Sequence, residues 1–194
     1  ALAGLFLLDT WRVNDKYMIL QDIPQQFRGP KTPVMEFLAK GSNQYRLLNM
    51  NNSDPMQYVT NNIPVMYTSN PVQLQRWQDY LDAFTLGSAM PDIINVKYLL
   101  VSGHQYRKEA PNFGTRYYPA FEDKAANEVL LENRAVMPKA WLVSTLSTVS
   151  KPEDILKYLQ NPAFDPRQSA FVETKPPFPG KPDKNETVNK VSVI

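Results

Sequence analysis

The chain has 194 residues, of which 43% are hydrophobic and 21% charged, and its net charge is +2. This is a globular composition, and it excludes wholesale disorder. With no cysteine and a single histidine, the chain cannot form a disulfide scaffold, a thiolate metal site or a multi-histidine metal site. Its acidic and basic residues are interspersed, so the basic stripe that nucleic-acid binding requires is missing.

The chain contains unusually few glycines and unusually many prolines. The 7 glycines are isolated from one another, which excludes a glycine-rich nucleotide loop, and we expect no cofactor. The 17 prolines exceed the usual share of about 5%. The composition therefore favours irregular, extended, proline-rich connections.

The first eight residues are uncharged and apolar, and Asp9, Trp11 and Arg12 follow at once. One interpretation is a short buried helix. The other is the end of a transmembrane helix, because a span reaches the membrane–water interface with an aromatic anchor and then charge. Eight residues alone fall short of the about 20 that a span needs.

In the next part of the chain, Thr32 suits a helix N-cap and Pro33 the first helical position. This predicts a helix that ends at Gly41. A short strand is predicted over 45–50, and residues 51–70 read as a loop.

A second helix is predicted to start with Asn70 as its cap and Pro71 at its first position. Its apolar residues recur every three or four positions; they are Leu74, Trp77, Leu81 and Phe84. The β-branched apolar run at 93–101 then predicts a central strand buried on both faces.

Further strands are predicted at 117–121, 129–132, 140–146 and 170–172. Asn133 and Arg134 suit a turn after the second of these. Ser150 and Glu153 have capping-box spacing, which predicts a helix that Asn161-Pro162 would stop. Residues 174–187 resemble a proline-rich linker, and the valines after it suggest the start of a truncated, β-rich region.

We therefore expect an α+β fold (mixed α/β), with a central mixed β-sheet and helices packed on it. Three segments are predicted. Residues 1–30 are membrane-proximal, with the end of a transmembrane helix and an extended approach. Residues 31–173 form the folded domain, and residues 174–194 form the linker and the truncated region.

No arrangement of residues points to a catalytic site. His104 follows the predicted central strand and reads as a loop histidine, and no serine-nucleophile motif accompanies it. Asp79 and Asp82 share a helix face, where paired carboxylates could run sugar chemistry; a solvated face is favoured. We expect no catalytic, cofactor-binding or metal residues.

One segment, from Gln105 to Tyr118, mixes aromatic with basic residues. It could stack sugars or contact anionic headgroups, or it could be a hairpin with tyrosines packed inward and charges in water. The candidate ligand or surface contacts are Tyr106, Arg107, Arg116, Tyr117 and Tyr118.

Four groups of motifs, in order along residues 9–173, resemble a known family. They are Asp9-Thr10-Trp11-Arg12-Val13-Asn14 with Tyr17; Tyr45-Arg46-Leu47; Gln75-Arg76-Trp77-Gln78-Asp79-Tyr80 with Ile94-Asn95-Val96-Lys97-Tyr98-Leu99-Leu100; and Glu132-Asn133, Met137-Pro138-Lys139-Ala140-Trp141-Leu142-Val143, Phe164-Asp165-Pro166 and Ala170-Phe171-Val172-Glu173. The set resembles the extracytoplasmic portion of YfhO-like bacterial membrane proteins, which are similar to C-type membrane glycosyltransferases. Family members often carry a Gly-Tyr-His-like segment before the second helix; residues 65–70 here have no histidine.

The resemblance implies that residues 31–173 are an extracytoplasmic domain of a polytopic protein of the cytoplasmic membrane, facing the periplasm or cell exterior. The implied partners are the transmembrane core of the same chain and a cell-envelope glycan or lipid-linked sugar, with no nucleic acid. The resemblance carries over no catalytic residue, because the family's catalytic acid lies in an earlier loop.

The leading hypothesis is a domain of a protein resembling polyprenyl-phosphate-sugar-dependent glycosyltransferases. It would bind an acceptor or act as a scaffold without being catalytic by itself, while the activity of the full-length protein stays open. The alternatives are a self-contained hydrolase that uses His104 or the paired acids, and a purely structural spacer domain.

Overall fold

The computed structural model describes residues 2–17, 31–41, 44–68 and 72–176. The chain divides into two compact units, residues 1–30 and 31–194. Most of the predicted C-terminal linker and the truncated strand lie outside the described residues. Each unit is described by itself below.

The first unit contains helix α1, Leu2–Tyr17. The hydroxyl of Thr10 donates to the carbonyl oxygen of Phe6 one turn earlier, at 2.7 Å. Within the described ranges, no helix has both the length and the apolar character needed to cross a membrane.

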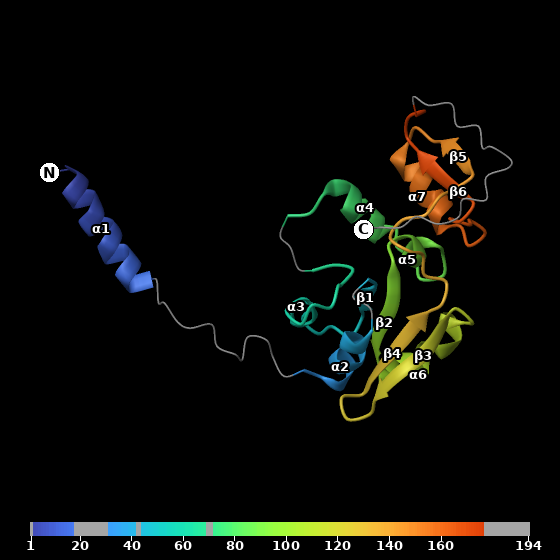
Figure 1. The fold of residues 1–194 in the computed structure, drawn as a ribbon, viewed down its shortest axis with the longest axis horizontal. Helices are drawn as coiled ribbons and strands as arrows, with labels where there is room; N and C mark the ends of the chain where they lie inside the picture. Colours follow the sequence, from blue (N-terminus) through green and yellow to red (C-terminus); the bar gives the residue numbers. More distant parts are fainter. Residues whose placement is uncertain (1, 18–30, 42–43, 69–71, 177–194) are drawn as a thin grey trace. The chain divides into compact units, whose positions relative to one another are not determined.

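The second unit is built on a four-stranded sheet with strand order β1-β2-β4-β3 (Figure 1). The β1–β2 pair is parallel, and the other two pairs are antiparallel. The strands are β1 Arg46–Asn49, β2 Val96–Ser102, β3 Tyr117–Asp123 and β4 Glu128–Asn133. The predicted α+β fold with a central mixed sheet is confirmed.

Strand β2 is a central strand buried on both faces, as the apolar run predicts. Neighbouring residues contact different cores: Leu99 belongs to one apolar cluster and Leu100 to the other. The strand starts later than predicted, at residue 96. Residues 90–93 form helix α5 (Met90–Ile93) instead, and Asn95 takes a positive φ of 64°, which ends the helical path before the strand begins.

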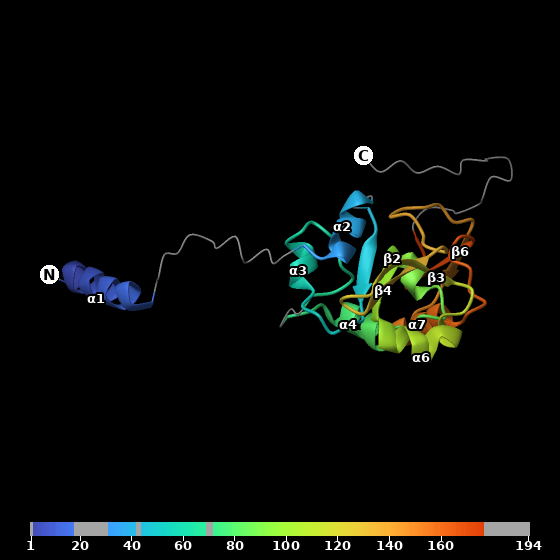
Figure 2. The ribbon, with the colours of Figure 1, turned by 90° about the horizontal axis from the view of Figure 1, so that it is seen from below.

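Helices cover both faces of this sheet (Figure 2). Helix α2, Pro33–Lys40, supplies Val34, Met35 and Leu38 to one core. Helix α6, Gly103–Phe113, supplies Phe113 to the other. The predicted start of α2 is confirmed, because the Thr32 side chain accepts a hydrogen bond from the backbone N–H of Met35 at 3.3 Å.

Two predictions in the middle of the chain need correction. The loop expected over 51–70 contains a short helix, α3 Met56–Val59, whose Tyr58 is buried against the α2 side of the sheet. Helix α4 runs from Gln75 to Asp82 with Leu74 at its N-cap, so it starts four residues later than position 71. The expected cap, Asn70, and Pro71 lie outside the described residues.

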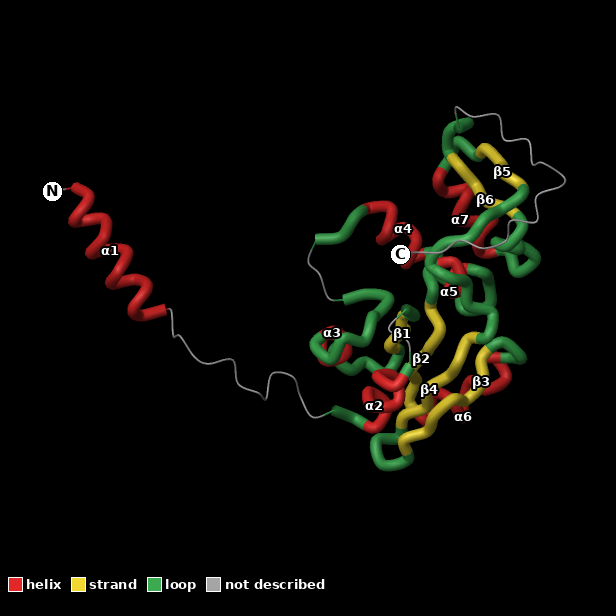
Figure 3. The backbone as a smooth tube through the Cα atoms, viewed as in Figure 1, coloured by secondary structure: helices red, strands yellow, loops and turns green. Residues whose placement is uncertain are grey.

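The C-terminal part forms a second, two-stranded parallel sheet of β5 Thr145–Thr148 and β6 Ser169–Val172, with helix α7 Pro152–Gln160 between them in sequence (Figure 3). The strand predicted at 140–146 is wrong over 140–144. The capping box is also wrong: Lys151 occupies the N-cap position without a side-chain bond. The fixed φ of Pro152 suits the first helical position, and this places the cap one residue after Ser150. The predicted helix end at Asn161 and the last strand are confirmed.

Candidate functional site

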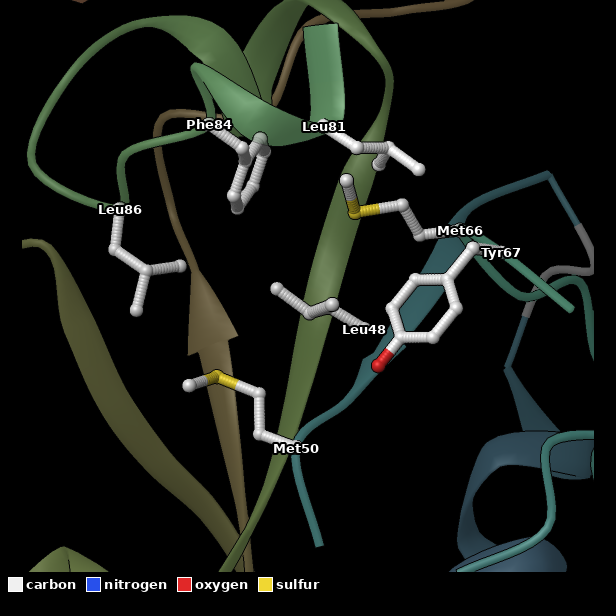
Figure 4. Close-up of a pocket in the computed structure, with 7 residues that line it drawn as sticks. All are labelled: Leu48, Met50, Met66, Tyr67, Leu81, Phe84 and Leu86. Carbon is white, nitrogen blue, oxygen red and sulfur yellow. The ribbon is translucent and has the colours of Figure 1, made fainter. Parts of the chain in front are cut away.

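A cavity of about 390 Å³ lies in the second unit, on the α4 side of the sheet. Its lining residues come from β1 and the residue after it, from the segment 66–67, and from α4 with the turn that follows. They are Leu48, Met50, Met66, Tyr67, Leu81, Phe84 and Leu86. Figure 4 shows these side chains arranged around Leu48.

Strand β1 and the segment at 65–66 position one wall of the cavity. The backbone N–H of Leu47 donates to the carbonyl of Pro64, and the N–H of Met66 donates to the carbonyl of Leu47, each at 2.8 Å. Leu47 and Val65 form an isolated parallel bridge. Because side chains alternate along a strand, Leu47 packs with the α2 core while Leu48 faces the cavity.

Helix α4 forms the opposite wall. Leu81 of α4 and Phe84, two residues after the helix end, pack against the sheet core. The helix lacks a side-chain cap and is held by other contacts. The hydroxyl of Tyr80 donates to the carbonyl of Met90 at 2.7 Å, and Arg76 forms an ion pair with Glu173 at 2.7 Å.

Tyr67 carries the only hydroxyl group among the seven lining side chains. That hydroxyl donates to the backbone carbonyl of Asn49 at 3.0 Å. None of the seven lining residues carries a charge at neutral pH. This lining is suited mainly to apolar contact.

A second hollow of about 300 Å³ adjoins the cavity and shares Met66 and Tyr67 with it. Its lining is more polar, because it includes Thr68 and Gln73 beside the indole of Trp77. The Trp77 ring stacks on Tyr80 with centroids 5.6 Å apart. Together, the two hollows form an apolar compartment next to one that has both polar and apolar lining residues.

A buried polar cluster lies at the end of β4. Asp92 accepts hydrogen bonds from Asn133, at 2.7 Å, and from the guanidinium of Arg116. Burial raises the pKa of Tyr117 above its usual range, and its hydroxyl donates to the carbonyl of Leu86 at 2.8 Å. This cluster ties α5, β3 and β4 together and supports the turn that lines the cavity.

The five predicted contact residues are not brought together on one surface. Arg116 and Tyr117 belong to the buried cluster, and Tyr117, which is 5% exposed, is not available as a surface contact. Tyr106 is half-buried and stacks on Phe113 with ring centroids 6.2 Å apart. Arg107 and Tyr118, however, stay accessible.

Arg107 is exposed and donates to the Asn127 side chain at 3.3 Å. Tyr118 is half-buried, and the Arg134 guanidinium lies 4.0 Å from its ring centroid. Strand alternation places Tyr118 and Tyr117 on opposite faces of the sheet. The segment 105–118 is a helix followed by a strand, so the hairpin alternative is wrong.

The other candidates of the sequence lie away from the cavity. His104 is exposed in the first turn of α6, so the expectation of a loop histidine is wrong. Asp79 accepts from the Gln75 amide, and Asp82 from the Gln78 amide, each at 2.7 Å. Among the described residues, no group of three or more His, Cys, Asp or Glu residues could hold a metal ion.

Sequence reasoning missed the cavity because Met50, Met66 and Tyr67 fall in or beside a stretch read as a loop. One signal was present: residues 63–67, Ile-Pro-Val-Met-Tyr, are more apolar than a solvated loop requires. Comparisons with protein-family models, with curated proteins and with solved structures found no match for this chain.

Proposed function

We propose that the chain is an extracytoplasmic part of a membrane protein of the cytoplasmic membrane, facing the periplasm or cell exterior. In this proposal, α1 enters the lipid and the second unit binds an acceptor or acts as a scaffold. The observation that carries the membrane attachment is the run of consecutive apolar residues within helix α1. Leu5, Phe6, Leu7 and Leu8 lie in the first half of that helix.

These four side chains cover most of the circumference of the helix. Successive residues are about 100° apart around an α-helix, so four consecutive apolar residues leave no polar face. A helix that packs on one protein surface needs an apolar stripe on one side only. Lipid, in contrast, surrounds a helix that is inserted in a membrane, so such a helix is apolar on every side.

The second half of α1 has the features of a membrane–water boundary. Asp9 and Arg12 are the first charged residues, and Trp11 lies between them. Tryptophan and basic residues favour the headgroup level. The hydroxyl of Thr10 is satisfied within the helix by the Phe6 carbonyl, which suits a residue at the edge of the hydrocarbon region.

The binding or scaffolding role of the second unit is supported by the apolar cavity and its more polar neighbour. A concave, mostly apolar hollow with a few polar groups is the usual form of a ligand site. The resemblance to membrane glycosyltransferases suggests an acceptor, a cell-envelope glycan or a lipid-linked sugar as ligand, and the transmembrane core of the same chain as partner. His104 and Asp79 line neither hollow, so the geometry does not favour a self-contained hydrolase.

Vesicle flotation tests the membrane attachment. The 194-residue chain should float with neutral phosphatidylcholine vesicles, and replacing Leu5, Phe6, Leu7 and Leu8 by serine should leave it in the aqueous fraction. The matched control replaces two exposed leucines of the second unit, Leu142 and Leu146, by serine, and this chain should still float. A wild-type chain that stays in the aqueous fraction contradicts the proposal.

The non-catalytic role has a separate test. The chain, incubated with polyprenyl-phosphate sugars and candidate acceptors, should transfer no sugar, because no catalytic group lines the cavity. Measurable transfer by the chain alone would show that it is an enzyme in its own right.

A further inference from the structure

We infer that the cavity around Leu48 binds an aliphatic hydrocarbon chain, the tail of an amphiphilic ligand whose polar part lies in the adjoining hollow. The inference deepens the binding role proposed for the second unit and rests on that role. It does not depend on the insertion of α1 into lipid. Its basis is the chemistry of the lining.

Three polar groups of the lining residues already have hydrogen-bond partners. The Tyr67 hydroxyl donates to Asn49, and the backbone N–H of Met50 donates to the carbonyl of Leu100 at 2.8 Å. The carbonyl of Leu86 accepts from Tyr117. These three groups therefore offer a ligand little hydrogen bonding in place of the water that it loses on binding, and that loss is costly for a polar ligand group.

The apolar lining also favours an alkyl chain over a peptide as the ligand. A peptide segment brings backbone N–H and C=O groups, and each of these needs a partner when it is buried. A hydrocarbon chain brings none. The occupant that fits leucine, phenylalanine and methionine walls is therefore an unfunctionalised chain.

The dimensions and composition of the cavity agree with such an occupant. A volume of about 390 Å³ lies in the range of about 300–1,000 Å³ typical of ligand pockets. Met50 and Met66 belong to opposite parts of the wall (Figure 4). Their flexible thioether side chains can adjust to chains of different shape.

The adjoining hollow supplies the place for a polar head. It meets the cavity at Met66 and Tyr67, and it adds the amide of Gln73, the hydroxyl of Thr68 and the indole of Trp77. A ligand with one apolar and one polar end would therefore lie with its tail against Leu48 and its head towards Gln73.

A series of 1-alkanols tests the inference in the full chain, without vesicles. The readout is the ¹³C-methyl NMR signals of Met50 and Met66, which line the cavity, with those of the buried Met35 and Met90 as internal references. Affinity at the cavity should rise about fourfold for each added methylene until the cavity is filled, and then level off. Signals that do not shift, or shift without dependence on chain length, would overturn the inference.

Two variants locate the site. Leu81→Trp should fill the cavity and weaken alkanol binding at least tenfold, whereas Leu142→Trp, a substitution at an exposed residue outside the cavity, should leave binding unchanged. Phe84→Leu should enlarge the cavity and move the plateau to longer chains, and it keeps the test open if Leu81→Trp does not fold. Equal binding by all three variants and the wild type would refute the site. Loss of vesicle flotation with intact alkanol binding would instead refute only the membrane attachment.

Discussion

The side-chain amide of Asn133, at the end of β4, donates to the carboxylate of Asp92 in α5 at 2.7 Å, although 41 residues separate them in the sequence. The same amide donates to the carbonyl of Val96 at 3.0 Å, and Arg116 donates to the other carboxylate oxygen. Asp92 and Asn133 are both buried. One acidic side chain of α5 thus contacts both β4 and the residue before β3.

Removing this carboxylate should strongly destabilise the domain. We predict that Asp92→Ala lowers the free energy of unfolding by about 3–5 kcal/mol, because it leaves the partly buried Arg116 and the Asn133 amide without their acceptor. Asp92→Asn should cost less, since it keeps an oxygen for Asn133. Urea unfolding measures both.

The matched control for Asp92 is Asp154. It is exposed and pairs with Lys157 at 2.9 Å, and water replaces such a surface pair with little loss. Asp154→Ala should leave the urea midpoint unchanged. If both substitutions change the urea midpoint equally, the buried cluster contributes no more to stability than a surface ion pair does.

Ionisation of the Glu128 carboxyl should lower the stability of the domain as the pH rises. Burial, and to a smaller extent the nearby Asp123, raise the pKa of this carboxyl above its ordinary value of 4.5, although the Asn51 amide opposes the shift. Since the folded state holds the proton more tightly than the unfolded state, folding is favoured below pH 4.5 and loses that contribution as pH rises through the folded-state pKa. Glu128→Gln should therefore be slightly more stable than wild type at pH 7.

Urea unfolding at pH 4 and pH 7 tests this sign. The difference between Glu128→Gln and wild type should be larger at pH 7 than at pH 4, and glutamine keeps an oxygen for the Asn51 amide, which now donates at 2.6 Å. A variant that is less stable than wild type at pH 7 would contradict the prediction.

Gly103 allows the close approach of the β3–β4 turn to the start of α6. A Cβ at this position would overlap the side-chain oxygen of Asn127, and the Gly103 N–H donates to the Asn127 carbonyl at 2.7 Å. We predict that Gly103→Ala destabilises the domain by about 1–2 kcal/mol. Thermal unfolding measures the effect.

A second substitution tests the cause of that cost. Asn127 has a φ of 54°, which glycine adopts readily, so Asn127→Gly should keep the turn while removing the overlapping atoms. In the Asn127→Gly background, Gly103→Ala should lower the free energy of unfolding only slightly. If the cost is the same in both backgrounds, the Asn127 side chain is not its source.

The absence of cysteine makes the proposed extracytoplasmic location directly testable. Lys108 is exposed on α6, and Lys108→Cys introduces a thiol there. In intact cells that express the protein from its natural reading frame, a membrane-impermeant maleimide should label this cysteine, and the unsubstituted protein gives the background. Labelling that appears only after lysis would place the domain on the cytoplasmic side.

Local signals predicted the elements whose cause is local. Thr32 caps α2 because its hydroxyl reaches the N–H of Met35 three residues later, and Asn161-Pro162 ends α7 because proline cannot continue a helix. The run 93–101 predicted a strand buried on both faces, which forms from residue 96, because apolar residues on both sides of a strand need two cores. These effects act over a few residues, so they can be seen in the sequence.

Predictions that failed depended on partners distant in the sequence. Tyr58 of α3, in the stretch predicted as a loop, is buried with Val34 of α2 and Leu100 of β2. The surface role suggested for Tyr117 failed because its hydroxyl meets Leu86. The cavity needs β1, the segment at 66–67 and α4 at once, and no local pattern specifies their convergence.

The sequence by itself determined the composition limits, the mixed sheet with its central strand and the helix start set by Thr32. It also determined the apolar character of residues 5–8, since that follows from residue type. Only the tertiary structure decided which side chains are buried together. It buried Tyr117, paired the partly buried Arg116 with Asp92, and assembled the cavity around Leu48. The physical reason is that backbone preferences and capping act between near neighbours, whereas burial and hydrogen-bond partners depend on chain segments that meet only in the fold.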